Sequence, residues 1–145
     1  MLLKKLQKKV ESDNKQHEKR VALGKRSRNK GASFERTIAK YLQEKYGIEF
    51  VRTPQSGGFA KNAKKAEGFR GDIVPADDSV NIKLHVECKN TKTWSLPKWF
   101  EQAESDAPKG KVPVVIFHKH NTSKNYIALS LEDFCELVKD IKGEN

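Results

Sequence analysis

The sequence predicts an α/β fold: a mixed β-sheet with helices on its faces, preceded by a basic N-terminal arm. Segments with helical spacing and segments with strand patterning follow one another from residue 31 in the order α-β-β-β-α-β-β-α. The continuous apolar run 113–117 is typical of a strand buried on both faces. Residues 1–30 hold eleven Lys/Arg against three Asp/Glu, a net of +8 out of the chain's +10.

Length and composition limit the class of protein. The 145 residues suit one domain, expected over residues 31–145, behind an arm of residues 1–30. Mean hydropathy is −0.78, and no apolar run approaches a membrane-spanning length, so we expect no membrane association. The N-terminus is charged and lacks the apolar core of a secretory signal. Two cysteines, Cys88 and Cys135, are too few for a disulfide scaffold and indicate reduced thiols in the cytoplasm.

The arm is expected to be only partly ordered. Three apolar residues at helical spacing predict a short helix over residues 1–10, with a break at Asp13 and Asn14. Residues 25–31 are too polar to pack and are expected to be mobile. Such an arm suits a polyanion, because each Lys or Arg near a phosphate releases condensed counterions.

The folded part is expected to begin at Ser33, which would cap a helix ending near Gly47. In the strand over 81–89, Leu84, Val86 and Cys88 point to one side and the polar residues to the other. A long glycine-rich, basic loop is expected over 53–71. The remaining strands are expected at 48–52, 72–74, 113–117 and 126–129, and the remaining helices at 96–105 and 130–142.

Three side chains predict the chemistry. Glu87 and Lys89 project from the same face of their strand, and Asp72 begins the strand before it. If the two strands pair as a hairpin, Asp72 reaches Glu87, and two converging carboxylates need a cation. Mg²⁺ prefers such oxygen ligands, and Lys89 adds a positive charge beside them. Glu35, in the first helical turn after residue 33, can approach the same edge.

The segments Gly71-Asp72-Ile73 and Val86-Glu87-Cys88-Lys89, with Glu35 on the preceding helix, resemble the PD-(D/E)xK nuclease superfamily. Within it, the chain is most similar to the small Holliday junction resolvases of archaea and phages. That resemblance runs from residue 30 to about residue 126 and includes the stretches KGASFER, Val51-Arg52 and Ser56-Gly57-Gly58. Gly71 departs from the pattern, since proline often stands there.

The resemblance implies a restriction-endonuclease-like core and a metal-dependent endodeoxyribonuclease. It implies a homodimer that nicks branched DNA such as four-way junctions, leaving 5′-phosphate and 3′-hydroxyl ends, in a prokaryotic or phage-infected cell. Mg²⁺ would be the cofactor, with Mn²⁺ able to substitute. The implied ligands are Asp72, Glu87, the Cys88 backbone carbonyl and Glu35, directly or through water.

The resemblance also assigns roles to other residues. Lys89 would orient the attacking water, and Ser56 in the glycine-rich loop would assist cleavage. Charge and resemblance together give the candidate DNA-binding residues: Lys25, Arg26, Arg28, Lys30, Arg36, Arg52, Lys61, Lys64, Lys65 and Arg70.

Several readings stay open at this point. Gln102 either holds substrate near the site or is a solvated helical residue, and His85 either lies near the scissile phosphate or does not. Trp94 and Trp99 are expected to pack rather than stack on bases, and His118 and His120 to lie on the surface. The alternative functions are a restriction- or homing-type nuclease on the same core and a non-catalytic nucleic-acid-binding module.

Overall fold

The computed structural model describes residues 2–53, 71–77 and 79–142. Within them the elements occur in the predicted order. The helices are α1 (Leu2–Tyr46), α2 (Leu96–Asp106) and α3 (Leu131–Lys142). The strands are β1 (Phe50–Arg52), β2 (Ile73–Pro75), β3 (Leu84–Lys89), β4 (Val112–His118) and β5 (Asn125–Ala128). None of these helices is both long and apolar enough to cross a membrane.

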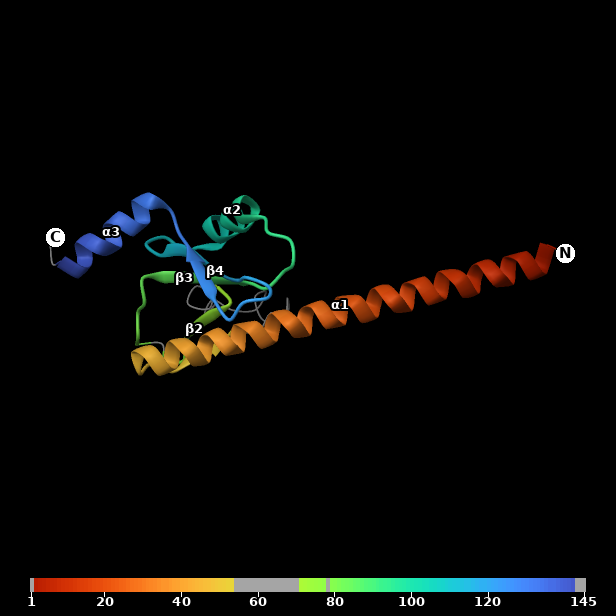
Figure 1. The fold of residues 1–145 in the computed structure, drawn as a ribbon, viewed down its shortest axis with the longest axis horizontal. Coiled ribbons are helices and arrows are strands. Elements are labelled where there is room, and N and C mark those ends of the chain that lie inside the picture. The colour runs from red at the N-terminus through yellow and green to blue at the C-terminus, as the bar shows by residue number, and fades with distance from the viewer. Residues whose placement is uncertain (1, 54–70, 78, 143–145) are drawn as a thin grey trace.

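The five strands form one mixed sheet in the order β1-β2-β3-β4-β5. Only β3 and β4 are parallel, and the other neighbours are antiparallel. The C-terminal part of α1 covers one face of the sheet and α2 lies on the other (Figure 1). The predicted α/β fold is therefore confirmed, and it matches a restriction-endonuclease-like core.

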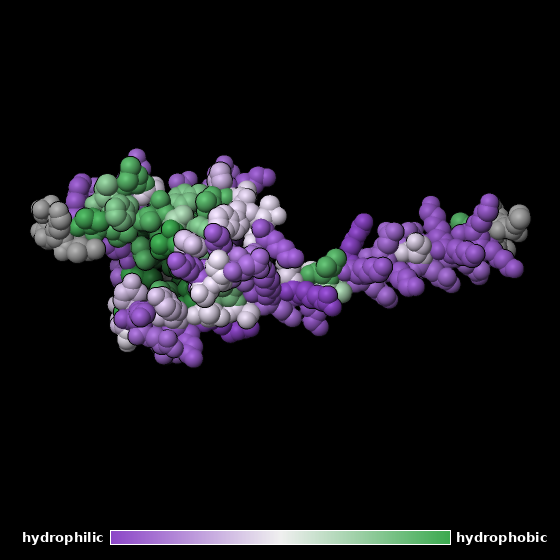
Figure 2. Space-filling view, viewed as in Figure 1, coloured by the Kyte–Doolittle hydropathy of each residue, from purple (hydrophilic) through white to green (hydrophobic). Residues whose placement is uncertain are grey.

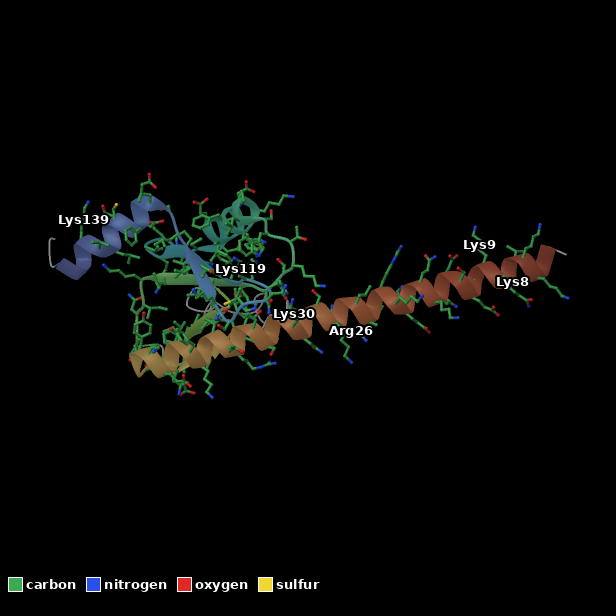
Figure 3. All side chains as sticks on the ribbon, in the orientation of Figure 1. Lys8, Lys9, Arg26, Lys30, Lys119 and Lys139 are labelled. Carbon is green, nitrogen blue, oxygen red and sulfur yellow. The ribbon has the colours of Figure 1, made fainter. Side chains whose placement is uncertain are left out.

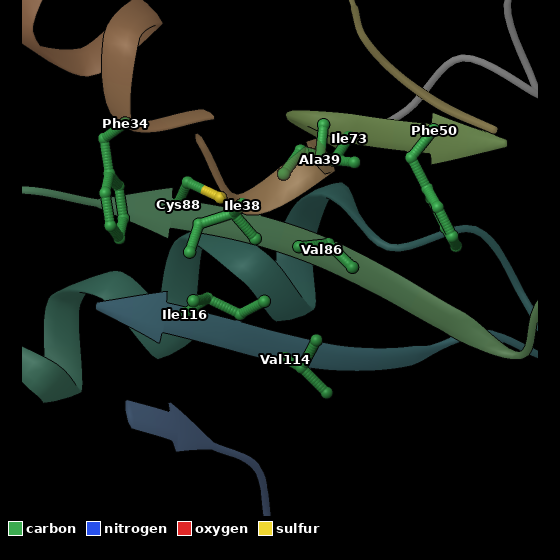
Figure 4. Packing of buried hydrophobic residues seen from close by; sticks show 9 residues of the cluster. All are labelled: Phe34, Ile38, Ala39, Phe50, Ile73, Val86, Cys88, Val114 and Ile116. Atoms are coloured by element: carbon green, nitrogen blue, oxygen red, sulfur yellow. The ribbon is translucent and has the colours of Figure 1, made fainter. Parts of the chain in front are cut away.

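Side chains along the central strands point alternately to the two faces of the sheet, so each face carries its own hydrophobic core. On β4, Val114 and Ile116 face α1, whereas Val115 and Phe117 face α2. The larger cluster joins Phe34 and Ile38 of α1 to the strands (Figure 4). The prediction that this apolar run is a strand buried on both faces is confirmed, since these four residues are at most 9% exposed.

The arm differs from the prediction. It is one continuous helix that runs into the domain, without a break at Asp13 and Asn14 and without a start at Ser33. The N-terminal half extends away from the domain (Figure 1). No proline occurs before residue 54, and Asp or Asn inside a helix costs only about 0.7 kcal/mol against alanine. Residues 25–31, expected to be mobile, are helical and mostly exposed.

The ends of the helices follow local rules. Helix α1 stops at Gly47, whose φ of +67° is the left-handed conformation that favours glycine, and its N–H donates to the Gln43 carbonyl at 2.9 Å. At the start of α3, the Ser130 hydroxyl accepts from the Asp133 N–H at 3.0 Å and donates to the Asp133 carboxylate at 2.6 Å. Ser130 thus begins the last helix as predicted.

Candidate active site

The pairing of β2 with β3 brings the two predicted carboxylates together. Ile73 lies opposite Val86, and this antiparallel register places Asp72 opposite Glu87. The Asp72 N–H donates to the Val86 carbonyl at 2.7 Å, and the Asp72 Oδ2 accepts from the Cys88 N–H at 2.7 Å. The backbone N–H and the carboxylate of Asp72 are therefore both hydrogen-bonded to β3.

Gly71 explains why the chain lacks proline before the aspartate. Its φ is +102°, whereas proline is held near −65°. A Cβ atom here would lie 3.1 Å from the Val86 carbonyl oxygen and 3.3 Å from the His85 Nδ1. The Gly71 carbonyl also accepts a hydrogen bond from the Thr53 hydroxyl at 2.5 Å. The backbone is thus drawn close to β3, and only glycine fits without a shift.

The two carboxylates open into a cavity of about 360 Å³. Side chains from α1, the β2–β3 edge and α2 meet there. Its lining residues are Glu35, Thr53, Gly71, Asp72, Glu87, Cys88, Lys89, Gln102 and Asp106.

Glu87 is the most strongly perturbed acid in the cavity. Its side chain is 7% exposed, and burial together with the Asp72 charge raises its pKa to about 7, while Lys89 opposes the rise. The Lys89 Nζ lies 3.3 Å from the Glu87 Oε2 and donates to the Gln102 Oε1 at 2.9 Å. Gln102 is therefore no free helical residue, because it holds the lysine beside the carboxylate.

Glu35 also reaches the cavity, from α1, but it has a partner of its own. The Arg52 Nε on β1 donates to the Glu35 Oε2, which forms a largely buried ion pair. Burial raises the pKa of Glu35, and the hydrogen bond from Arg52 works against the rise. Arg52, predicted to bind DNA, thus contacts a predicted site carboxylate. A ligand role for Glu35 stays a prediction.

Two residues of β3 lie away from the solvent. His85 is 2% exposed, and its Nε2 is 3.7 Å from the Glu87 Oε1, behind the carboxylates rather than in the cavity lining. Cys88 presents its backbone to the cavity and its thiol to the core (Figure 4). Burial raises the pKa of that thiol, which makes it unreactive.

The other candidates lie around this centre. Arg36 and the candidate arm cations at positions 25, 26, 28 and 30 are exposed on α1. Trp94 and Trp99 pack against Phe117, with ring centroids 5.3 and 6.1 Å away, so the packing prediction is confirmed. Some predicted residues lie outside the described part of the chain: Ser56, Lys61, Lys64, Lys65 and Arg70.

Sequence reasoning missed two residues of the lining. Thr53 directly follows β1, and its backbone N–H donates to the Asp72 carbonyl at 3.0 Å. Asp106 lies four residues after Gln102 on α2, which puts it on the same helix face. That spacing was the available signal for Asp106.

The oxygen atoms in the cavity suit a hard divalent cation. In the described residues, no three His, Cys, Asp or Glu side chains form a ready metal cluster. The donors present are the Asp72 and Glu87 carboxylates and the backbone of Cys88, and Mg²⁺ is commonly held by one or two carboxylates plus water. The raised pKa of Glu87 fits this use, because a cation would offset the repulsion between the two acids.

A family model described as "Phage putative PDDEXK endonuclease" matches residues 26–144. The chain belongs to this family. The match covers Glu35, Asp72, Glu87 and Lys89, and it confirms the predicted PD-(D/E)xK relationship and a nuclease function. The comparison with curated proteins found no match, and neither did the comparison with solved structures.

Proposed function

We propose that this PDDEXK protein is a Mg²⁺-dependent endodeoxyribonuclease that nicks branched DNA, with the four-way junction as its substrate. The observation that carries the proposal is the cavity in which Asp72, Glu87 and Lys89 converge. The choice of a junction rests on the sequence resemblance to small resolvases. Recombination and repair of DNA are the processes in which such an activity would serve.

Each residue has a distinct task in this proposal. Asp72, Glu87 and the Cys88 carbonyl would hold Mg²⁺ or Mn²⁺, with Glu35 acting directly or through water. The bound ion would supply a more acidic water and offset the charge of the scissile phosphate. Lys89, held by Gln102 at 2.9 Å, would direct its ammonium group toward the attacking water and the charge that develops on the phosphate.

The test is a gel that compares a four-way junction, a flap, a linear duplex and a single strand in Mg²⁺. Asp72→Asn should lose nicking on the preferred substrate, and Lys89→Ala should slow it by roughly 10²–10³. Asp77→Asn and Lys98→Ala are matched controls, because both side chains are exposed and neither lines the cavity. Full activity in Asp72→Asn and Lys89→Ala would overturn this site and place the active site elsewhere, whereas a parent protein that binds DNA but nicks none of the four substrates would favour the binding module.

The arm is proposed to hold DNA through one face of α1. Six Lys or Arg residues of α1 are separated in turn by four and by seven residues. At 3.6 residues per turn, they lie within an arc of about 80° around the helix and extend over about 40 Å of its length. We call them the basic stripe: Lys4, Lys8, Lys15, Lys19, Arg26 and Lys30. Basic side chains line the helix beyond the domain (Figure 3), and its surface there is mostly hydrophilic (Figure 2).

Neighbouring cations outside the stripe provide a matched control for this proposal. The stripe triple is Lys8, Lys19 and Arg26, and the off-stripe triple is Lys9, Arg20 and Lys25. Each triple contains two lysines and one arginine at nearly the same places along α1. Changing either triple to alanine removes the same charge, so any difference in DNA binding reports on which face of the helix meets the DNA.

A homodimer is also part of the proposal. The β5 edge of the sheet and α3 leave apolar side chains in water, with Ile127, Leu131 and Phe134 between 52% and 72% exposed. The space-filling view shows an apolar patch over this end of the molecule (Figure 2). A second copy covering the patch would place two catalytic cavities in one particle, as symmetric nicking of a junction requires.

A further inference from the structure

A second pocket, of about 320 Å³, lies between α1 and the ends of the central strands. It is formed where β3 and β4 end, because parallel strands finish at the same edge of a sheet. Its lining residues are Lys30, Ser33, Phe34, Thr37, Asn90, His118, Ser123 and Asn125.

The charge of this pocket is the opposite of that of the catalytic cavity. Four carboxylates line the cavity, whereas no Asp or Glu occurs among the described lining residues of the second pocket. The Lys30 Nζ lies 3.2 Å from the His120 Nε2. Burial lowers the pKa of His120, and the nearby Lys30 and His118 lower it further, so the partner of this lysine is an imidazole rather than a carboxylate.

Polar groups around the lysine complete a site for an oxyanion. The Asn90 Oδ1 is buried without a hydrogen-bond partner in the described residues. Rotating the side-chain amide by half a turn would place its NH₂ group at this position, where it could donate to an oxyanion. The His118 Nδ1 lies 2.9 Å from the Asn125 Oδ1, which fixes the orientation of the ring beside the pocket. Ser33 and Ser123 add hydroxyl donors to the lining.

The pocket and the catalytic cavity are adjacent. Cys88 lines the cavity and Asn90 lines the pocket, and two residues along a strand span about 7 Å. On α1 the neighbours Glu35 and Phe34 are divided in the same way. Lys30 is both the last member of the basic stripe and part of the pocket, so the stripe leads directly to it (Figure 3).

We propose that this pocket binds a backbone phosphate of the DNA strand that enters the catalytic cavity. The inference rests on the proposed nuclease function and adds a strand-positioning site beside the metal site. Lys30 supplies the charge, and Asn90 and the two serines supply hydrogen bonds. His118 and His120, which the site chemistry does not use, then serve to form the pocket and to hold its lysine.

The test pairs protein variants with DNA in which one phosphate at a time is replaced by a neutral methylphosphonate. The probe is a synthetic four-way junction bound in Ca²⁺, without cleavage. Lys30→Ala should weaken binding roughly tenfold to a hundredfold, as expected for a hydrogen-bonded charge. One methylphosphonate position should weaken binding by the parent protein and by Lys40→Ala, yet have no further effect on Lys30→Ala.

Asn90→Ala provides a second variant that leaves the net charge unchanged. It should lose sensitivity at the same methylphosphonate position, which a general electrostatic effect cannot produce. If every methylphosphonate position that weakens binding by the parent and by Lys40→Ala also weakens binding by Lys30→Ala, the pocket assignment is wrong, even while the parent protein cleaves DNA. If the parent binds the junction in Ca²⁺ but cleaves no DNA in Mg²⁺, the nuclease proposal fails, and phosphate coupling is judged separately. If the parent binds no DNA, both fail.

Discussion

Replacing Glu87 by glutamine should stabilise the protein in the absence of metal. The pKa of Glu87 is raised to about 7 from 4.5 by burial and by the Asp72 charge. Keeping this side chain ionised in the folded protein therefore costs up to about 3 kcal/mol at pH 8. Glutamine has nearly the same shape and no charge, so the variant avoids that cost.

The sign of the pH dependence follows from the same two pKa values. The unfolded chain releases this proton above pH 4.5, while the folded protein keeps it up to about pH 7. The free energy of unfolding of the parent is therefore not reduced by Glu87 below pH 4.5. It falls between pH 4.5 and 7 and stays at the lower value above pH 7. The advantage of Glu87→Gln should be absent at pH 4.5 and fully developed at pH 8.

Thermal melts followed by circular dichroism in EDTA provide the assay. At pH 8 the variant should melt up to roughly 10 °C above the parent. Adding Mg²⁺ at pH 8 should raise the Tm of the parent and leave Glu87→Gln nearly unchanged, because binding to the folded state alone stabilises it. Glu101→Gln, at an exposed position of α2, is the control. The electrostatic argument would be refuted if the Tm of Glu87→Gln at pH 8 were no higher than that of the parent. It would also be refuted if the difference in Tm were the same at pH 4.5 and pH 8.

Three further predictions concern the backbone, the arm and the apolar patch. Gly71→Ala should destabilise the protein by about 1–3 kcal/mol in denaturant titrations, whereas Gly24→Ala, with nothing within 4 Å, should stabilise it slightly; equal effects would contradict the backbone argument. Alanine at the stripe triple should reduce the slope of log affinity against log salt by about 2 to 3, and the off-stripe triple should change it far less; equal slopes would show that the helix face does not matter. The double change of Leu131 and Phe134 to aspartate should convert the proposed dimer to a monomer in light scattering, and an unchanged mass would place the contact elsewhere.

The sequence predicted the centre of the site well, because strand pleat decides which side chains share a face. Glu87 and Lys89 are two residues apart, and Asp72 needed only a hairpin pairing to meet them, so local rules were enough. The position of His85 was not decided by those rules. It shares a face with Glu87, but how deeply α2 and the edge of β2 bury that face is a property of tertiary packing.

The partners of the site residues could not be predicted in the same way. The pairing of Arg52 with Glu35 and of Lys89 with Gln102 joins elements that are distant in sequence, and their distance depends on how α1 and α2 lie against the sheet. The continuity of α1 was missed for a different reason. Asp13 and Asn14 are weak interruptions, and no proline enforces a break, so small propensities did not decide the boundary.

The unbroken path of α1 has a mechanical consequence. The helix that carries the basic stripe also carries Phe34 and Glu35, so a rigid rod joins the arm to the core with no hinge between them. Along such a rod, each residue inserted after Asn29 would turn the stripe by about 100° relative to the cavity and shift it by about 1.5 Å. An insertion of eleven residues would nearly restore the phase while lengthening the reach. If the arm lies along DNA as proposed, the length of the helix would set how far along the DNA the domain sits, and its rotational phase would set which side the cavity faces.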